Sequence, residues 1–459
     1  MVSDRMKLLD AARRHAQEYL ETINDRPVHA LITGQDLRDR LAGELPDAGE
    51  EPEAVIGNLA AAARLGTAAT QGPRYFGFVT GSSLPVATAA DWMVSIWDQN
   101  AGVHVMSPFA AVVEQVTASF IQDLLGLPPS WSVGYVTGGH MANFTALAAA
   151  RHHVLREAGW DVEADGLFGA PAITVVAGEE AHYTIATALR LLGLGADRVV
   201  RVPTDSQGRM DAGALTRILR TSSGPRIVCA QAGNVNTGAF DPLDEVADAT
   251  HEHGAWLHVD GAFGLWAAAS PSRVHLTQGI DRADSLATDA HKWLNVPYDC
   301  GIVLCARPDA HRAAMRLPAS YIQVTSDERD PRDYVPEESR RARVVPVYAV
   351  LRSLGRNGLA ELVDRCCRHA RRFAEGLAAA GYEIRNQVVL NQVLVSFGDD
   401  ETTRRVIAGV QDEGTCWCGG SVWRGRTSMR ISVSSWATTE EDVEKSLHAI
   451  IRVARGVTA

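Results

Sequence analysis

The region from about residue 85 to residue 310 alternates between helical stretches and short β-branched runs, and this alternation constrains the fold more than any other feature. The helical stretches include "AAVVEQVTASFIQDLLGL" and "PLDEVADATHEHG", and the strand-like runs include "AITVVAG", "RIVCAQAG", "AWLHVDGAFG" and "GIVLCA". Strands that alternate with helices of this length predict βαβ units in a mainly parallel sheet. The runs are apolar throughout, which predicts that helices cover both faces of the sheet.

The flanking segments divide the chain into three predicted units. Residues 1–84 are expected to be helical, and their first helix is amphipathic and would leave an apolar stripe bare on its own. Residues 85–343 form the predicted α/β domain and end in a polar, proline-punctuated loop that begins near residue 316, and such long loops are usually functional. Residues 344–459 are expected to form a smaller α+β domain.

Composition and charge exclude several classes of protein. The 459 residues are 46% hydrophobic and 22% charged, which is typical of a globular protein. A net charge of −11 without basic clusters argues against nucleic-acid binding. No apolar run approaches the ~18 residues of a membrane span, and the N-terminus lacks a signal-peptide core. Seven scattered cysteines indicate reduced thiols in a cytoplasmic protein, and Cys416 and Cys418 lack the partners that a metal site needs.

Unusual polar residues follow several of the predicted strands, at the edge where open parallel sheets bind ligands. Asp260 ends the strand in "AWLHVDGAFG", and a buried carboxylate needs a cation or a strong donor beside it. Gly138 and Gly139 form a turn between a strand and a helix, which is typical of sites that hold an anion, most often a phosphate. His182 begins another helix, and three polar residues follow a further strand: Asn234, Asn236 and Thr237.

Taken singly, each of these residues has an ordinary explanation. Glycines are common before helices, His182 could be a helix-start histidine, and Asp260 could cap a helix. Lys292, in "SLATDAHKWLNVPYDCG", could be a solvated side chain. Together, however, a phosphate turn, a buried acid and a lysine 32 residues beyond it are the parts that pyridoxal phosphate requires.

Each part has a chemical role toward that cofactor. The Lys292 amine would form a Schiff base, the Asp260 carboxylate would keep the pyridine nitrogen protonated, and the helix N-terminus would take the phosphate. We expect partial desolvation to lower the pKa of Lys292, so that its amine is available as a nucleophile.

Three segments resemble the group II pyridoxal-phosphate-dependent amino-acid decarboxylases, which include the aromatic-amino-acid, histidine and glutamate decarboxylases. They are "HVDGAFG", "TDAHKWLNVPYDCG" and, near the start, "PRYFGFVTGSSLP". The resemblance covers nearly the whole chain, and its His-Lys-Trp motif is far more specific than a glycine turn. It implies an α/β fold of the aspartate-aminotransferase-like type (fold type I), with a mainly parallel seven-stranded sheet in the large domain.

The resemblance also implies a role for particular residues. Lys292 would carry the cofactor, His182 would stack on its ring, and Tyr321 would return a proton to Cα after CO2 leaves. Family members with phenylalanine at the position of Tyr321 tend to be oxidative aldehyde synthases, so this tyrosine favours plain decarboxylation. The implied cofactor contacts are Gly138, Gly139, His140 and His291 around the phosphate, Asn236 near the ring oxygen, Asp260 at the pyridinium and Ala262 beneath the ring.

The chain departs from the family pattern at three places. His140 stands where many relatives have serine or threonine, which suggests that the phosphate contact there is mainly through the backbone. Asp289 replaces an asparagine near the phosphate, where a carboxylate would need neutralising. Gln99 and Asn100 replace apolar residues in a segment that reaches the neighbouring subunit's pocket. The residues expected to meet substrate are Tyr75, Phe76, Phe78, Gln99 and Asn100, with Gly77 removing a side chain, and this wetter pocket argues against an aromatic substrate.

These inferences predict decarboxylation of an L-amino acid to its amine and CO2, with the scissile bond aligned perpendicular to the cofactor ring. Three rival reactions keep the cofactor: oxidative decarboxylation to an aldehyde, carbon–carbon cleavage, and transamination, for which Arg430 could bind the substrate α-carboxylate. A more distant alternative is a non-catalytic protein that binds pyridoxal phosphate. The resemblance further implies a homodimer with shared active sites, and we expect the N-terminal helices to act as its clasp.

Overall fold

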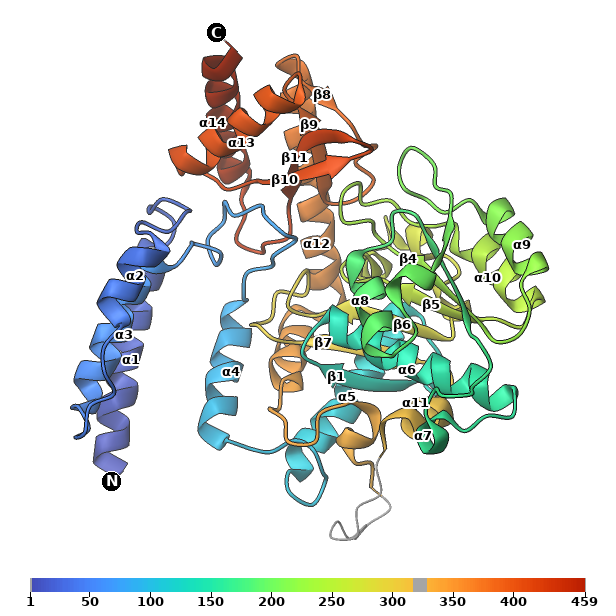
Figure 1. Ribbon diagram of the computed structural model, residues 1–459. Coiled ribbons are helices and arrows are strands. Elements are labelled where there is room, and N and C mark those ends of the chain that lie inside the picture. The colour runs from blue at the N-terminus through green and yellow to red at the C-terminus, as the bar shows by residue number, and fades with distance from the viewer. Residues whose placement is uncertain (1, 317–327, 459) are drawn as a thin grey trace.

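The computed structural model describes residues 2–316 and 328–458 (Figure 1). The helices are α1 (Val2–Thr22), α2 (Gly34–Leu41), α3 (Pro52–Gly66), α4 (Pro85–Trp97), α5 (Pro108–Leu125), α6 (Gly139–Glu157), α7 (Val162–Asp165), α8 (Tyr183–Leu191), α9 (Ala212–Thr221), α10 (Leu243–Glu252), α11 (Pro308–Met315), α12 (Val344–Ala379), α13 (Asp400–Glu413) and α14 (Glu440–Thr458). Among the residues in these two ranges, no helix combines the length and the apolar character that crossing a membrane requires.

Two sheets organise the chain. The strands of the large sheet are β1 (Ser132–Val136), β2 (Thr174–Gly178), β3 (Val200–Val202), β4 (Arg226–Gln231), β5 (Trp256–Asp260), β6 (Ser285–Asp289) and β7 (Gly301–Cys305). They lie in the order β1-β7-β6-β5-β4-β2-β3, and only β7 runs antiparallel to its neighbours. The predicted mainly parallel seven-stranded sheet is therefore confirmed.

Helices cover both faces of this sheet, as the apolar strands predicted. Successive residues of a strand point to opposite faces, and in β4 Ile227 and Cys229 join one buried cluster whereas Val228 and Ala230 join the other. The first cluster is closed by α6, α8 and α11, and the second by α5, α9, α10 and α12. Both faces of the sheet are thus covered, and the buried His258 in the middle of β5 finds its hydrogen-bond partners inside the protein.

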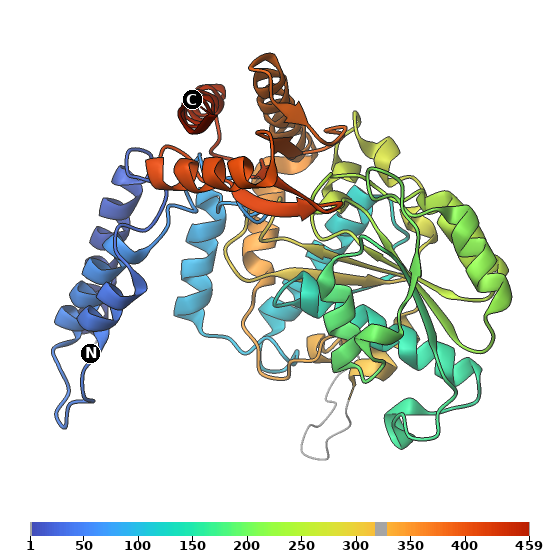
Figure 2. The same cartoon turned by 45° about the horizontal axis from the view of Figure 1, so that its top comes forward.

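The second sheet belongs to the small domain and has the order β10-β11-β9-β8. Its strands are β8 (Glu383–Ile384), β9 (Gln392–Ser396), β10 (Gly419–Trp423) and β11 (Arg426–Ser432). The long helix α12, which kinks at the non-helical residue Gly355, runs from the large domain to the small one. Helices α1, α2 and α3 stand apart from the large domain in both views (Figures 1 and 2). The division of the chain into units 1–84, 85–343 and 344–459 stays a prediction.

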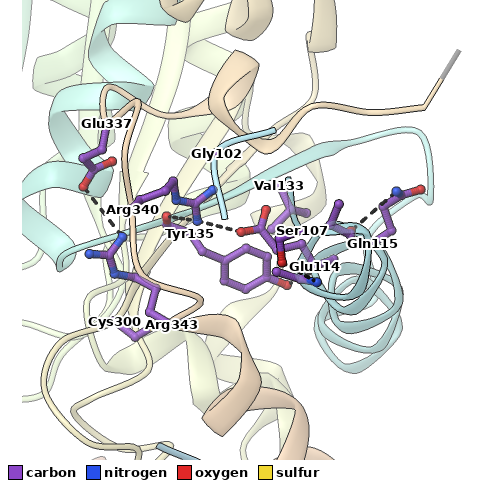
Figure 3. A network of polar contacts seen from close by, with 12 residues as sticks. Gly102, Ser107, Glu114, Gln115, Val133, Tyr135, Cys300, Glu337, Arg340 and Arg343 are labelled. Atoms are coloured by element: carbon purple, nitrogen blue, oxygen red, sulfur yellow. Dashed lines mark hydrogen bonds and ion pairs between the residues drawn. The ribbon is translucent and has the colours of Figure 1, made fainter. Parts of the chain in front are cut away.

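A buried ion pair joins α5 to the chain just before α12 (Figure 3). The Arg340 side chain is fully buried, and its Nη2 lies 2.6 Å from Oε1 of Glu114 and donates to the Tyr135 carbonyl at 2.9 Å. The backbone of Arg340 fixes the turn around Asn100: its N–H donates to Asn100 Oδ1, and its carbonyl accepts from Ala101. One buried pair thus ties together three segments that are distant in sequence.

Removal of the Glu114 charge tests this tie. Glu114→Gln leaves the Arg340 guanidinium buried without its counter-charge, which we expect to lower the free energy of unfolding by about 3 to 5 kcal/mol. The measurement is urea unfolding followed by circular dichroism. The matched control is Glu361→Gln, which breaks an exposed pair with Arg368 and should cost less than about 1 kcal/mol. Equal effects of the two substitutions would contradict the assignment.

Candidate active site at the carboxyl edge of the large sheet

Parallel pairing of β5 with β6 brings the predicted acid and lysine to one edge of the sheet. Asp260, the last residue of β5, lies opposite Ala287 of β6. Asp289 ends β6, and Lys292 follows in the next turn. Trp293 is fully buried against Phe263, so the indole beside the lysine anchors this turn in the core.

A chain of hydrogen bonds supports the buried Asp260 carboxylate. Asn143 Nδ2 donates to Asp260 Oδ2 at 3.1 Å, and the Ala262 N–H donates to Oδ1 at 3.1 Å. Since Asn143 Oδ1 must accept, His258 donates to it through Nε2 at 2.9 Å and accepts at Nδ1 from Ser285 Oγ at 3.0 Å. Burial lowers the pKa of His258 to about 4, so its ring is neutral. This hydrogen-bond network presents only donors to the Asp260 carboxylate.

Lys292 is one of three lysines in the chain, and the other two, Lys7 and Lys445, lie on exposed helix surfaces. Its Nζ lies 2.9 Å from Asp289 Oδ2, and its side chain is 22% exposed. Burial acts to lower the pKa of Lys292, but the charge and hydrogen bond of Asp289 and the charge of Asp260 outweigh it, so the pKa is raised. The expectation of a lowered pKa is therefore wrong, because it left out the neighbouring carboxylates.

Asp289 lies at the start of α6, where the sequence predicted a phosphate. Its Oδ1 accepts a hydrogen bond from the N–H of Gly139, the first residue of the 19-residue helix. A Cβ at Gly139 would lie 2.6 Å from Asp289 Oδ2, so this approach requires glycine. His291 Nδ1 accepts from the Cys300 N–H at 3.1 Å, which leaves its proton on Nε2, 3.3 Å from Asp289 Oδ1. Asp289 thus engages groups from α6 and from the lysine turn.

His182 lies at the start of α8, and the charges of Asp260 and Lys292 act on its pKa. Its Nδ1 accepts from the Thr184 N–H at 3.4 Å and lies 2.8 Å from Thr184 Oγ1, so its proton is on Nε2. Burial lowers the pKa of His182, Asp260 opposes this shift, and Lys292 and Arg430 add to it. The structure therefore brings His182, Asp260 and Lys292 together.

The other residues predicted to contact the cofactor do not all lie beside Lys292. Gly138 caps α6, and its neighbour His140 has a buried Nε2 without a hydrogen-bond partner among the described residues. Ala262 follows the acid and accepts from the Asp289 N–H at 2.8 Å. Asn236 instead accepts from Ser421 Oγ of the small domain at 2.6 Å. No hydrogen bond or ion pair within residues 2–316 and 328–458 joins Asn236 to the lysine cluster, so its contact with the cofactor stays a prediction.

Three aromatic side chains form a stack beside this edge, and one of them was not anticipated from the sequence. The Trp417 ring stacks on Tyr75 at 5.1 Å and on Phe78 at 5.3 Å. A Cβ at Gly77 would lie 2.2 Å from the Trp417 ring, so the space left by the glycine is filled by the indole. Phe76 is 1% exposed and packs edge-to-face on Phe373, which makes it a core residue, and its contact with substrate stays a prediction.

The remaining predicted substrate residues point to the surface of the protomer or lie outside the described residues. Gln99 is exposed and donates to the Trp97 carbonyl at 3.0 Å. Asn100 Oδ1 accepts from Gly102 and Arg340, so much of its polar capacity is used within the turn. Tyr321 falls in residues 317–327, outside the described ranges.

Arg430 of β11 is the small domain's contribution to the site. Its positive charge acts on His182, and burial lowers the pKa of its own guanidinium. Among the described residues its side chain has no hydrogen-bond or ion-pair partner, unlike Arg426 on the same strand, which pairs with Glu383 at 3.1 Å. A partly buried arginine without a counter-charge is suited to bind an anionic group of a ligand.

These residues fit pyridoxal phosphate. The site offers one largely covered amine for attachment, one carboxylate surrounded by hydrogen-bond donors, and an imidazole from the start of α8. The glycine start of α6 offers a backbone N–H, and the His140 Nε2 beside it is buried without a partner among the described residues. This polar atom is therefore free to bind an oxygen of the cofactor phosphate.

Comparison with known proteins agrees with this chemistry. The family model for the pyridoxal-dependent decarboxylase conserved domain matches residues 35–398. An aromatic-L-amino-acid decarboxylase of Bacillus atrophaeus is 29% identical over 76% of this chain and 72% of its own length. An L-2,4-diaminobutyrate decarboxylase of Rhizobium meliloti is also 29% identical, over 90% of this chain and 86% of its own length.

Solved structures share the whole fold at low sequence identity. The structure of Oryza sativa TDC with PLP and tryptamine superposes with a TM-score of 0.93 at 22% identity and covers 100% of this chain and 99% of its own. Mouse CSAD superposes with a TM-score of 0.92 at 23% identity, over 98% and 99% of the two chains. At such identities the likeness shows the fold, which is of the aspartate-aminotransferase type. Because the family model spans most of the chain, this protein belongs to the pyridoxal-dependent decarboxylases and acts on amino acids with pyridoxal 5′-phosphate as its cofactor.

Proposed function

We propose that this enzyme converts an L-amino acid to its amine and CO2 with Lys292 as the cofactor-bearing residue and Asp260, His182 and Tyr321 in the roles predicted from the sequence. The observation that carries this assignment is the position of Lys292, the one lysine of the three whose side chain is mostly covered, near the buried Asp260. When bound, pyridoxal phosphate supplies a ring that accepts the electron pair left on Cα as CO2 departs.

The protein's own residues prepare and complete that step. Asp260, surrounded by donors, keeps a negative charge at the edge where the ring nitrogen would lie. His182, neutral because of burial and protonated on Nε2, offers a ring face and a donor beside Lys292. Tyr321 would return the proton to Cα, which favours plain over oxidative decarboxylation.

We further propose that Arg430 binds a substrate carboxylate. The positive charge of its guanidinium lowers the pKa of His182, and the guanidinium has no hydrogen-bond or ion-pair partner among the described residues. The same observation supports the rival hypothesis that the enzyme is a transaminase, but the related proteins named above are decarboxylases. A carboxylate held at one side of the site can orient the Cα–carboxylate bond, which selects among the reactions that this cofactor allows.

We propose a homodimer as the active form. Helices α4 and α5 expose an apolar surface, termed here the α4–α5 face: Trp92, Met93, Ile96, Trp97, Phe109, Val112 and Val116. An apolar groove of ≈ 480 Å³ adjoins it and is lined by Pro108, Phe109, Val112, Val113, Val116, Val345 and Tyr348. Single exposed apolar residues are normal, but a continuous surface of this kind indicates an interface. The Gln99–Asn100 turn follows α4 directly, so a partner seated there would meet it.

The proposed compartment is the cytoplasm. All seven cysteines are free and buried thiols, which is the usual state in a reducing environment.

Lys292 is tested by cofactor attachment and by products. Wild-type protein should gain a visible absorbance band with pyridoxal phosphate, and borohydride reduction followed by peptide mapping should find the adduct at Lys292. Lys292→Ala should lose both, whereas Lys445→Ala, at an exposed lysine, should keep both. An amino-acid panel should yield amine and CO2 in equal amounts without ammonia or peroxide. An adduct at another lysine, or products of oxidation or transamination, would contradict the proposal.

Arg430 is tested by kinetics with the best substrate of that panel. Arg430→Ala should lower kcat/KM by about tenfold or more, because a charge-assisted hydrogen bond is worth about 1.5 to 3 kcal/mol. Arg430→Lys should recover part of the loss. Arg426→Ala, at the exposed pair on the same strand, serves as control and should leave kcat/KM near the wild-type value. An unchanged kcat/KM in Arg430→Ala would exclude the carboxylate-binding role.

The dimer is tested by placing a charge on the α4–α5 face. Ile96→Asp puts a carboxylate at a side chain that is 59% exposed in the protomer and should convert a dimer at micromolar concentration to monomers, because burying an unpaired charge is costly. Sedimentation velocity gives the mass of both proteins. Phe168→Asp, at an exposed apolar residue outside this face, should stay dimeric. A wild-type monomer with full activity would refute the proposal.

A further inference from the structure

Asp289 holds the groups that a cofactor phosphate would use. Its carboxylate accepts from the Gly139 N–H, lies 3.3 Å from the protonated Nε2 of His291, and lies 2.9 Å from the Lys292 amine. Gly139 and His291 are the predicted phosphate donors, and Lys292 is the predicted point of attachment. The negative charge of Asp289 therefore stands where the cofactor needs positive or donating groups.

The main chain keeps Asp289 in this position. Its N–H donates to the Ala262 carbonyl at 2.8 Å, and its own carbonyl accepts from Trp266 Nε1 at 3.1 Å. It also lies opposite Gly301 in the β6–β7 ladder. The side chain is 3% exposed, so an ionised carboxylate that turned away from these donors would still be buried. A buried charge without partners is strongly unfavourable.

The charges around Asp289 do not offset an added phosphate. The titratable groups on which its charge acts are Lys292, His291, Tyr298 and Cys300 from the segment after β6 and His182 from the start of α8; Asp260 of β5 acts on Lys292 and His182 as well. Lys292 is the one cation among them at neutral pH, because burial lowers the pKa of both histidines. Two carboxylates already share this cation before the phosphate brings further negative charge.

We propose that Asp289 opposes cofactor loading, and that binding of pyridoxal phosphate requires the Asp289 carboxyl to take up a proton from solvent. This inference rests on the cofactor assignment and on Lys292 as its attachment point. Protonation turns the carboxylate into a donor for a phosphate oxygen and releases the Lys292 amine from its ion pair. The proton returns to solvent when the cofactor leaves, so cofactor retention becomes a function of pH in this chain.

Substitution by the isosteric amide isolates the charge. Asp289→Asn keeps an oxygen that can accept from Gly139 and adds an N–H for a phosphate oxygen. At pH 8 the variant should bind pyridoxal phosphate about tenfold or more tightly than wild type, because two like charges no longer meet in a buried site. The dissociation constants come from titration of the apoproteins, followed by the visible absorbance of the lysine-bound cofactor and by tryptophan fluorescence.

The pH dependence gives a second, independent readout. Wild type alone must take up the additional proton, so its affinity relative to Asp289→Asn should rise by up to about tenfold for each unit that the pH falls from 8 toward 6. Ionisation of the free cofactor is common to both proteins and cancels in this ratio. Asp289→Asn also removes a charge that raises the pKa of Lys292, so the same comparison is repeated with a ligand that does not bond to the lysine. Inorganic phosphate, measured calorimetrically, probes the α6 cradle without the lysine and should bind the variant more tightly than wild type at pH 8.

Matched variants complete the design. Asp299→Asn removes a nearby carboxylate that is 44% exposed and pairs with Arg343, and it should change the affinity by less than about twofold, because exposed charges are screened. Asp289→Ser also removes the charge, with a smaller side chain. It takes the place of Asp289→Asn in the experiment if Asp289→Asn folds poorly. Equal affinities of wild type and both Asp289 variants, or parallel pH profiles, would overturn the inference. Absence of any lysine-bound cofactor in wild type and in both Asp289 variants, at pH 6 as at pH 8, would instead overturn the proposed function.

Discussion

Parallel pairing of β5 with β6 is the constraint on which the site depends. It puts the ends of two neighbouring strands at one edge, so that Asp260 and the turn bearing Lys292 face each other although 32 residues separate them. The buried Trp293 then holds the turn in place from within the core. The reactive amine is thus positioned by the same backbone hydrogen bonds and apolar contacts that stabilise the sheet, which is how a precise site can rest on a rigid scaffold.

Two carboxylates share one amine at this edge, and their surroundings differ. Asp260 is held by Asn143 and by a backbone N–H, and behind Asn143 the neutral His258 fixes the direction of each hydrogen bond. Asp289 contacts the lysine and the start of α6 directly. Both carboxylates raise the pKa of Lys292. In our proposal the first carboxylate keeps its charge toward the cofactor ring, whereas the second would meet the incoming phosphate. Asp260 and Asp289 are the same residue type, so the difference between their proposed roles comes from their surroundings.

The small domain adds Trp417, which was not anticipated from the sequence, and Arg430, which the sequence offered only as a carboxylate-binding residue of a rival transaminase. Trp417 fills the space beside Gly77 and joins Tyr75 and Phe78 in a stack, while Arg430 brings a positive charge toward His182. Both stand more than a hundred residues beyond the lysine. Their positions in the site depend on the path of α12 from the large domain to the small one, and this path is fixed only in the packed molecule.

The sequence by itself determined the mainly parallel sheet and the helices on both of its faces, and it singled out Lys292, Asp260 and His182 as candidates that the structure brings together, because strand–helix alternation and residues at strand ends are local patterns with few solutions. Asn143 could have been anticipated as well, since it stands one helical turn after Gly139 on the same helix. The tertiary structure alone decided that the pKa of Lys292 is raised, that Asp289 reaches the start of α6, and that Phe76 lies in the core. Those outcomes depend on distances between side chains from separate segments, and Coulomb interactions and packing at those distances are fixed only when the segments meet.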